Sequence, residues 1–125
     1  MEALNIMVVD DSILAVKMMT DFITELGHKV VKTAGSGREA LTAYEVCKPD
    51  VVTMDITMPD IDGIQATQTI MSRHPDARVI MVTSHAQERS VMSALHAGAR
   101  SYVLKPIQKE KLREVIDKVM AKEAT

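Results

Sequence analysis

The chain has 125 residues, of which 46% are hydrophobic and 26% charged, with a formal net charge of −2 at pH 7. This composition disfavours a disordered chain, and 15 basic against 17 acidic residues argue against bulk electrostatic binding of nucleic acid. One cysteine excludes an internal disulfide framework, and no apolar run approaches the roughly 20 residues that span a bilayer. Without a signal-peptide pattern in residues 1–10, we expect a single cytoplasmic domain over residues 1–125.

Ten segments of alternating character follow one another along the chain. Five are short, apolar and rich in Val, Ile and Met, as expected of strands, and five have the spacing or the end signals of helices. Gly27 and Gly98 end two of the predicted helices, Asp62 caps another, and Ser36 with Glu39 is typical of a capping box. In chain order we expect a strand at 4–9, a helix ending at 26, a strand at 28–33, a helix at 36–47, a strand at 51–54, a helix at 63–73, a strand at 78–82, a helix at 87–97, a strand at 101–104 and a last helix around 112–120.

The strict alternation of strands and helices predicts a parallel sheet, since each connection between strands carries a helix. Right-handed connections place helices on both faces, so we expect a doubly wound α/β fold with five parallel strands. In such sheets ligands bind beyond the carboxyl ends of the strands, where the strand order reverses. The polar residues that follow the strands are therefore the candidate functional residues.

Polar residues stand at the carboxyl ends of four predicted strands. Asp10 and Asp11 follow the first strand, Asp55 ends the third, Thr83 ends the fourth and Lys105 ends the fifth. Three carboxylates and one ammonium leave a charge of about −2, and two like charges 4 Å apart repel by about 4 kcal/mol at an effective dielectric constant near 20. Either protonation of a carboxyl group or a hard divalent cation such as Mg²⁺, which prefers oxygen ligands, would relieve the repulsion.

This set of groups suits phosphoryl transfer, which needs a nucleophile, a metal that neutralises charge and fixed donors for the remaining oxygens. Asp55, separate from the acidic pair, is the predicted nucleophile and would form an acyl phosphate. We expect Asp11, with Asp10 behind it, to hold the metal, and Lys105 and Thr83 to bind the incoming phosphoryl group. A helix cap or a turn explains each motif taken alone; their joint placement at successive strand ends favours the functional interpretation.

These residues, in this order, resemble the receiver domains of bacterial two-component response regulators. The resemblance covers essentially the whole chain and rests on Val8-Val9-Asp10-Asp11-Ser12, Asp50-Val51-Val52-Thr53-Met54-Asp55-Ile56-Thr57-Met58-Pro59, Asp62-Gly63, Thr83-Ser84, Ala97-Gly98-Ala99 and Lys105-Pro106. It implies a flavodoxin-like strand order of 2-1-3-4-5 and phosphorylation of Asp55 by a partner histidine kinase. It also implies Mg²⁺ bound through Asp10, Asp11, Asp55 and the backbone carbonyl of Thr57.

The resemblance further implies a conformational switch in which Thr83 moves towards the phosphoryl group and Tyr102 rotates inward. Thr57 and His85 occupy the two positions that tune the lifetime of the acyl phosphate in this family. The bond between Lys105 and Pro106 is usually cis there. Such proteins are phosphoacceptors that assist their own phosphorylation and dephosphorylation rather than classical enzymes.

Within the family, residues 53–59 and a chain that stops after the fifth helix are most similar to single-domain receivers of chemotaxis. This similarity implies a CheA-like histidine kinase as phosphodonor and a flagellar switch protein as target, docking on the fourth helix, fifth strand and fifth helix. It leaves room for a phosphatase partner, and implies a monomer with no nucleic-acid or membrane partner. A phosphorelay intermediate and a truncated transcriptional regulator are the alternatives.

Three partial matches point to other chemistry. Residues 35–40 fit the G-x-G-x-x-A fingerprint of dinucleotide-binding proteins, with Asp55 twenty residues beyond the first glycine, but a turn and a capping box explain the same segment. A phosphatase of the haloacid-dehalogenase type also uses an Asp nucleophile with Mg²⁺, but it requires a second Asp where Thr57 stands. Residues 60–63 resemble the middle of a calcium-binding loop that lacks its first acid, so a turn is the preferred interpretation.

Overall fold

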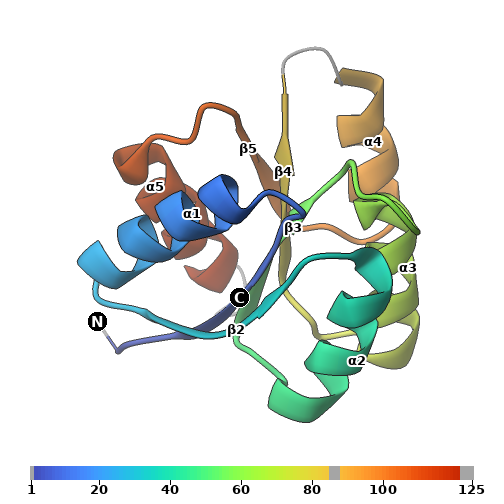
Figure 1. Ribbon diagram of the computed structural model, residues 1–125, viewed down its shortest axis with the longest axis horizontal. Helices are drawn as coiled ribbons and strands as arrows, with labels where there is room; N and C mark the ends of the chain where they lie inside the picture. Colours follow the sequence, from blue (N-terminus) through green and yellow to red (C-terminus); the bar gives the residue numbers. More distant parts are fainter. Residues whose placement is uncertain (1, 85–87, 122–125) are drawn as a thin grey trace.

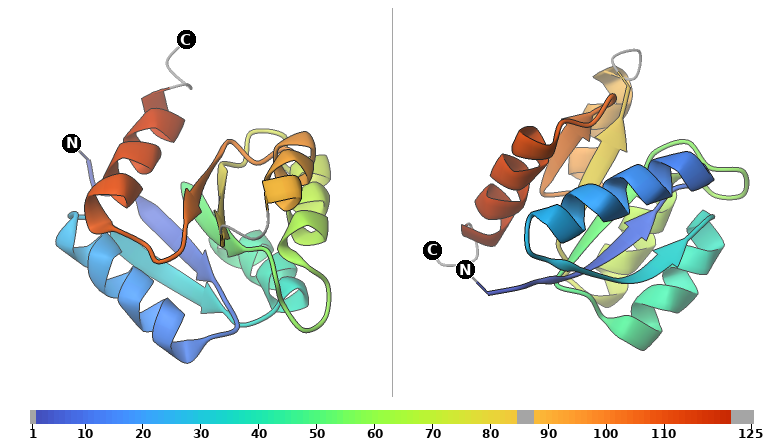
Figure 2. Two further views of the ribbon diagram at one scale, coloured as in Figure 1. Left: turned by 90° about the horizontal axis from the view of Figure 1, so that it is seen from above. Right: turned by 60° about the vertical axis from the view of Figure 1, so that its left-hand side comes forward.

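The computed structural model describes residues 2–84 and 88–121. In chain order the elements of this part of the protein are β1 (Asn5–Val9), α1 (Ile13–Glu25), β2 (Lys29–Ala34), α2 (Gly37–Cys47), β3 (Val51–Asp55), α3 (Gly63–Arg73), β4 (Val79–Thr83), α4 (Glu88–His96), β5 (Ser101–Leu104) and α5 (Lys109–Ala121). The strands form one parallel sheet in the order β2-β1-β3-β4-β5. Helices α1 and α5 cover one face and α2, α3 and α4 the other (Figure 1; Figure 2). The predicted fold class and strand order are confirmed.

All ten predicted elements are present, but the predicted capping box of α2 is only half correct. The Ser36 hydroxyl accepts the Glu39 N–H at 3.1 Å, as expected, whereas the Glu39 carboxylate accepts the Gly35 N–H at 2.9 Å. The long glutamate side chain thus reaches one residue beyond the cap. At α3 both halves of the box are made, because Asp62 accepts the Gln65 N–H and Gln65 accepts the Asp62 N–H.

The sheet separates two apolar cores. Strands β1, β3 and β4 are buried on both faces almost throughout, while the edge strands β2 and β5 expose several side chains. The core beneath α1 and α5 includes Ile6, Ile23, Ile80, Leu112 and Ile116. The core beneath α2, α3 and α4 includes Met7, Tyr44, Met54, Ile70 and Met81. Among the described residues, none of the helices has both the length and the apolarity that crossing a bilayer requires.

The parallel register brings the carboxyl ends of the strands to one edge of the sheet. Val9 lies opposite Met54, Asp55 opposite Val82, and Thr83 opposite Leu104. Each strand therefore ends within a residue or two of its neighbour. Polar residues that are far apart in sequence are thereby gathered over a single edge.

The buried hydroxyl of Thr53 generates a stability prediction. Thr53 is 1% exposed in the middle of β3, and its Oγ1 has no hydrogen-bond partner in the described part of the chain. A buried polar group without a partner costs about 1–3 kcal/mol. We expect Thr53→Val to raise the free energy of unfolding by about 1 kcal/mol in urea denaturation.

Thr67→Val is the matched control, because the Thr67 hydroxyl is equally buried but contacts the Met81 sulfur at 3.5 Å. This second variant should be neutral or destabilising. A fall in stability for Thr53→Val would show that its hydroxyl is satisfied in solution.

Candidate functional site

Asp10, Asp55 and Lys105 meet at the carboxyl edge of the sheet. Asp10 follows β1, Asp55 is the last residue of β3, and Lys105 follows β5. The Lys105 Nζ lies 3.4 Å from Asp10 Oδ2 and 3.4 Å from Asp55 Oδ1. Asp10 and Asp55 are buried, at 7% and 6% exposure, whereas the Lys105 side chain is 37% exposed. A lysine that reaches in from the rim thus bridges two buried carboxylates from different strands.

Asp11 completes an acidic cluster with these two carboxylates. Asp10, Asp11 and Asp55 each offer an oxygen, and the three oxygens lie within 4.8 Å of one another. Opposite ligands of a six-coordinate Mg²⁺ are about 4 Å apart, so small side-chain movements would let one ion contact all three. The donors are all hard oxygens, and Asp11 is exposed, so the cluster opens to solvent. This donor set fits a hard divalent cation.

Local contacts hold the two buried carboxylates in place. The Asp10 Oδ1 accepts the Ser12 N–H at 2.9 Å, and Ser12 in turn caps α1. At β3, Gly63 packs directly on the Asp55 carbonyl, and a Cβ at this glycine would collide with that oxygen. The close approach therefore requires glycine and ties the start of α3 to the end of β3.

Burial and charge perturb the titration of this site. Burial and the negative charge of Asp10 raise the pKa of Asp55 to about 6, although Lys105 opposes the rise. Burial alone would lower the pKa of Lys105, but Asp55 and Asp10 outweigh it and raise the pKa above its ordinary value. Lys105 therefore stays charged at neutral pH. Asp55 takes up its proton at a higher pH than an ordinary aspartate does.

Thr83 and Tyr102 lie on the opposite face of the sheet from Asp55. Val82 pairs with Asp55, so Thr83, one residue further along β4, points to the other face of the sheet. Thr83 is fully buried, and its hydroxyl donates to the carbonyl of Ser84 at 3.3 Å. Tyr102, which pairs with Met81 on this same face, is 40% exposed.

Two further predictions can be compared with the structure, and a third cannot. Thr57 is exposed, two residues beyond Asp55. The peptide bond between Lys105 and Pro106 is cis, as the resemblance implied. His85 lies outside the described residues.

Sequence reasoning missed the steric role of Gly63, which it treated only as the residue after the cap of α3. A signal was present. Glycine is a poor helix former, costing about 1 kcal/mol relative to alanine, so a glycine in the first turn of a helix indicates a steric requirement. Here the requirement is contact with the phosphoacceptor candidate, Asp55.

The raised pKa of Asp55 generates a pH-dependent stability prediction. The unfolded chain loses the Asp55 proton near pH 4 and the folded protein near pH 6, so the cost of the buried charge grows between these values and persists above them. In Mg²⁺-free buffer, Asp55→Asn should therefore stabilise the protein at pH 7–8, by up to about 3 kcal/mol. The advantage should shrink as the pH falls to 4.5.

Chemical denaturation across this pH range provides the measurement. Asp21→Asn, at an exposed carboxylate of α1 that pairs with Lys17, controls for the loss of one acidic charge. A stability difference for Asp55→Asn that stays constant with pH would contradict the prediction.

Comparison with known proteins shows the family of the chain. The family model of the response regulator receiver domain matches residues 6–117. The chemotaxis protein CheY of Thermotoga maritima is 40% identical over 115 residues, which cover 92% of this chain and 96% of that protein.

Solved structures show the same fold. A chain of the CheX-CheY-BeF3-Mg²⁺ complex from Borrelia burgdorferi matches with a TM-score of 0.88 and 36% identity over 93% of this chain and 88% of that chain. The response regulator domain of Thermotoga maritima CheB matches with a TM-score of 0.82 and 33% identity over 96% of each chain. The chain therefore belongs to the response regulator receiver domain family, whose CheY-like members are signalling proteins rather than classical enzymes.

Proposed function

We propose that this protein is the phosphoacceptor of a two-component pathway, in which Asp55 receives a phosphoryl group from a partner histidine kinase in the presence of Mg²⁺. The observation that carries the proposal is the position of Lys105, whose Nζ lies 3.4 Å from the carboxylates of both Asp10 and Asp55. These two carboxylates form an acidic cluster with Asp11. A buried nucleophile, a fixed cation and an oxygen donor set for a divalent ion are the parts that phosphoryl transfer needs.

Asp55 is the nucleophile in this proposal. One of its carboxylate oxygens forms a bond to phosphorus while the bond from phosphorus to the donor nitrogen or oxygen breaks, and the leaving group departs with the electron pair. The carboxylate must be ionised to attack, which the pKa of about 6 permits at neutral pH. Lys105, beside Asp55 Oδ1, offsets charge on the transferred oxygens.

Asp10, Asp11, Asp55 and the backbone carbonyl of Thr57 would hold Mg²⁺. When bound, the ion supplies positive charge that neutralises the phosphoryl oxygens. The contribution of the protein is to keep these oxygens close together against their mutual repulsion. The contact between Lys105 and the two buried carboxylates does this.

The dinucleotide alternative is disfavoured by what occupies the start of α2. A bound pyrophosphate would need the N–H groups of this first turn. The Asp60 carboxylate already accepts the Gly37 N–H at 3.0 Å and the Arg38 N–H at 2.9 Å. An anionic ligand would have to displace a carboxylate from its place.

The pathway we propose is chemotaxis in the cytoplasm. CheY proteins of Thermotoga maritima and Bacillus subtilis are 40% and 38% identical to this chain over nearly its whole length. A CheA-like kinase would then be the phosphodonor and a flagellar switch protein the target, with a phosphatase as a further partner. A receiver of another pathway would share the chemistry of Asp55 and differ in its partners, so phosphotransfer from a CheA-like kinase distinguishes the two.

Signalling would operate as a shift between two populated conformations. Thr83 and Tyr102 share one face of the sheet on neighbouring strands, so movement of Thr83 towards a phosphoryl group would change the space available to the tyrosine ring. A phosphoryl group shifts the equilibrium only by its differential interaction with the two states, typically 1–3 kcal/mol. Tyr102 is half-exposed here, so inward rotation would alter the surface that a partner contacts.

The central prediction concerns phosphorylation itself. Incubation with acetyl phosphate and Mg²⁺ should add one phosphoryl group, measured by intact-mass spectrometry, because Asp55 is a buried nucleophile beside a cation. The gain should vanish in Asp55→Asn and on removal of Mg²⁺ with EDTA, and persist in Asp21→Asn. Phosphorylation that survives in Asp55→Asn would disprove the assignment, and rapid multiple-turnover hydrolysis of a generic phosphate ester would favour a phosphatase.

A second prediction tests the switch by tyrosine fluorescence. The chain has two tyrosines and no tryptophan, and Tyr44 is 6% exposed, so quenching by acrylamide reports mainly on Tyr102. Phosphorylation should reduce the quenching as the Tyr102 ring turns inward. Thr83→Ala should retain the mass gain but lose the change in quenching.

Tyr102→Phe identifies the source of the signal, because only the buried Tyr44 then remains. An equal change in quenching for Thr83→Ala and the wild type would show that Thr83 does not transmit the phosphorylation signal.

A further inference from the structure

The loop from residue 56 to residue 62, between β3 and α3, carries Thr57 two residues after Asp55. Ile56 and Met58, on either side of Thr57, are buried in the core beneath α2, α3 and α4. At the far end of the loop, the Gly63 N–H donates to the Ile56 carbonyl at 2.7 Å. The loop thus folds back on itself, and Thr57, near its start, is exposed.

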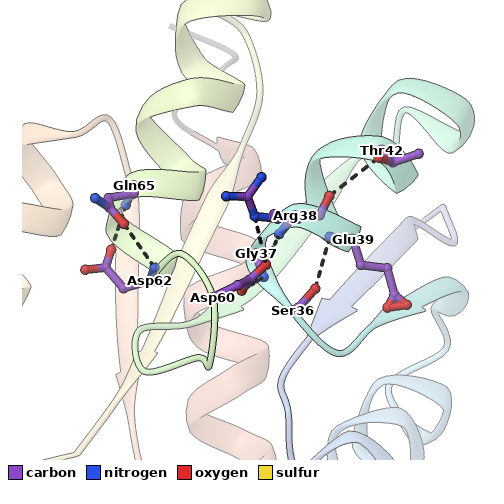
Figure 3. A network of polar contacts seen from close by, with 8 residues as sticks. All are labelled: Ser36, Gly37, Arg38, Glu39, Thr42, Asp60, Asp62 and Gln65. Atoms are coloured by element: carbon purple, nitrogen blue, oxygen red, sulfur yellow. Dashed lines mark hydrogen bonds and ion pairs between the residues drawn. The ribbon is translucent and has the colours of Figure 1, made fainter.

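Asp60, in this loop, is bound to a different helix. Its Oδ1 accepts the Gly37 N–H at 3.0 Å and its Oδ2 accepts the Arg38 N–H at 2.9 Å, both in the first turn of α2 (Figure 3). The Arg38 Nε lies 3.9 Å from the same Oδ2. A carboxylate at a helix N-terminus makes charge-assisted hydrogen bonds and interacts favourably with the helix dipole. One side chain therefore joins the loop to a helix more than 20 residues away in sequence.

Close packing reinforces this connection. A Cβ at Gly37 would collide with the side chain and carbonyl of Ile61, so the start of α2 and the loop are in direct contact. The next residue, Asp62, caps α3 through its capping box with Gln65 (Figure 3). The Arg38 and Gly37 N–H groups lower the pKa of Asp60, which keeps its carboxylate charged at neutral pH. The loop is thus held by α2 through one aspartate and by α3 through the next.

We propose that Asp60 is a positioning residue for the metal site: by fastening the loop to α2, it fixes the backbone carbonyl of Thr57 beside Asp55. This role rests on the proposed function, in which the backbone carbonyl of Thr57 is a ligand of Mg²⁺. Asp60 is three residues from Thr57, and both lie in one short loop whose ends are fixed. Mg²⁺ demands near-ideal octahedral geometry, so a loop free to shift at Asp60 would present a poorly placed ligand.

Mg²⁺ titration of the full chain by isothermal calorimetry tests the proposal. Removal of a group that orients a metal ligand typically weakens affinity 10–100-fold. We expect Asp60→Ala to bind Mg²⁺ about tenfold more weakly than the wild type. Asp60→Asn, which retains one carbonyl acceptor, should lie between them and provides the readout if Asp60→Ala does not fold. In the absence of Mg²⁺, amide hydrogen exchange at residues 56–58 should be faster in both variants.

Ser36→Ala is the matched control. It removes a hydrogen bond to the same first turn of α2, at the Glu39 N–H, but leaves the link to the loop intact. Its Mg²⁺ affinity should equal that of the wild type. Equal affinities for Asp60→Ala and the wild type, or an equal loss in Ser36→Ala, would overturn the positioning role while the metal site stands. No Mg²⁺ binding by the wild type would overturn the proposed metal site and this role with it.

Discussion

The burial of two neighbouring carboxylates, Asp10 and Asp55, is the electrostatic cost on which the rest of this structure depends. Asp10 and Asp55 are largely removed from water, and Lys105 at 3.4 Å from each compensates only part of their charge. Burial and the charge of Asp10 therefore raise the pKa of Asp55 despite the contact with Lys105. That residual charge lowers the stability of the fold and, in the function we propose, favours the binding of a divalent cation, whose positive charge then offsets that of the phosphoryl group. The protein is thus less stable because of the same residues that we propose for phosphoryl transfer.

The rest of the fold keeps these two carboxylates close together. Strands β1 and β3, which end at the acidic residues, are buried between two cores, so neither carboxylate can relax outward by moving its strand. Contacts from the loops complete the support. Gly63 packs on the Asp55 carbonyl, Ser12 binds Asp10, and Asp60 joins the loop after β3 to α2. Helices and loops on both faces of the sheet therefore support the acidic site at its carboxyl edge.

Local sequence patterns were sufficient to predict the elements and most of the acidic site. Alternating strands and helices require a parallel sheet, and a parallel sheet places the carboxyl ends of its strands at one edge, so Asp10, Asp55 and Lys105 could be expected to meet. The order of the strands came from the resemblance, because no local pattern encodes which strands are neighbours. Thr83 shows the same limit: its place at the strand end was predictable, but the register decided that it faces away from Asp55.

The sequence by itself determined where each strand and helix would lie and which polar residues would stand at the strand ends, because periodicity, caps and turns depend on near neighbours in the chain. Only the tertiary structure decided that Asp60, expected to be a turn residue, accepts two N–H groups in the first turn of α2, and that Gly63 contacts Asp55. It also decided that the hydroxyl of Thr53 is buried without a partner in the described part of the protein. Such contacts join groups whose separation depends on how whole elements pack, and packing has no signature in the spacing of residues along the chain.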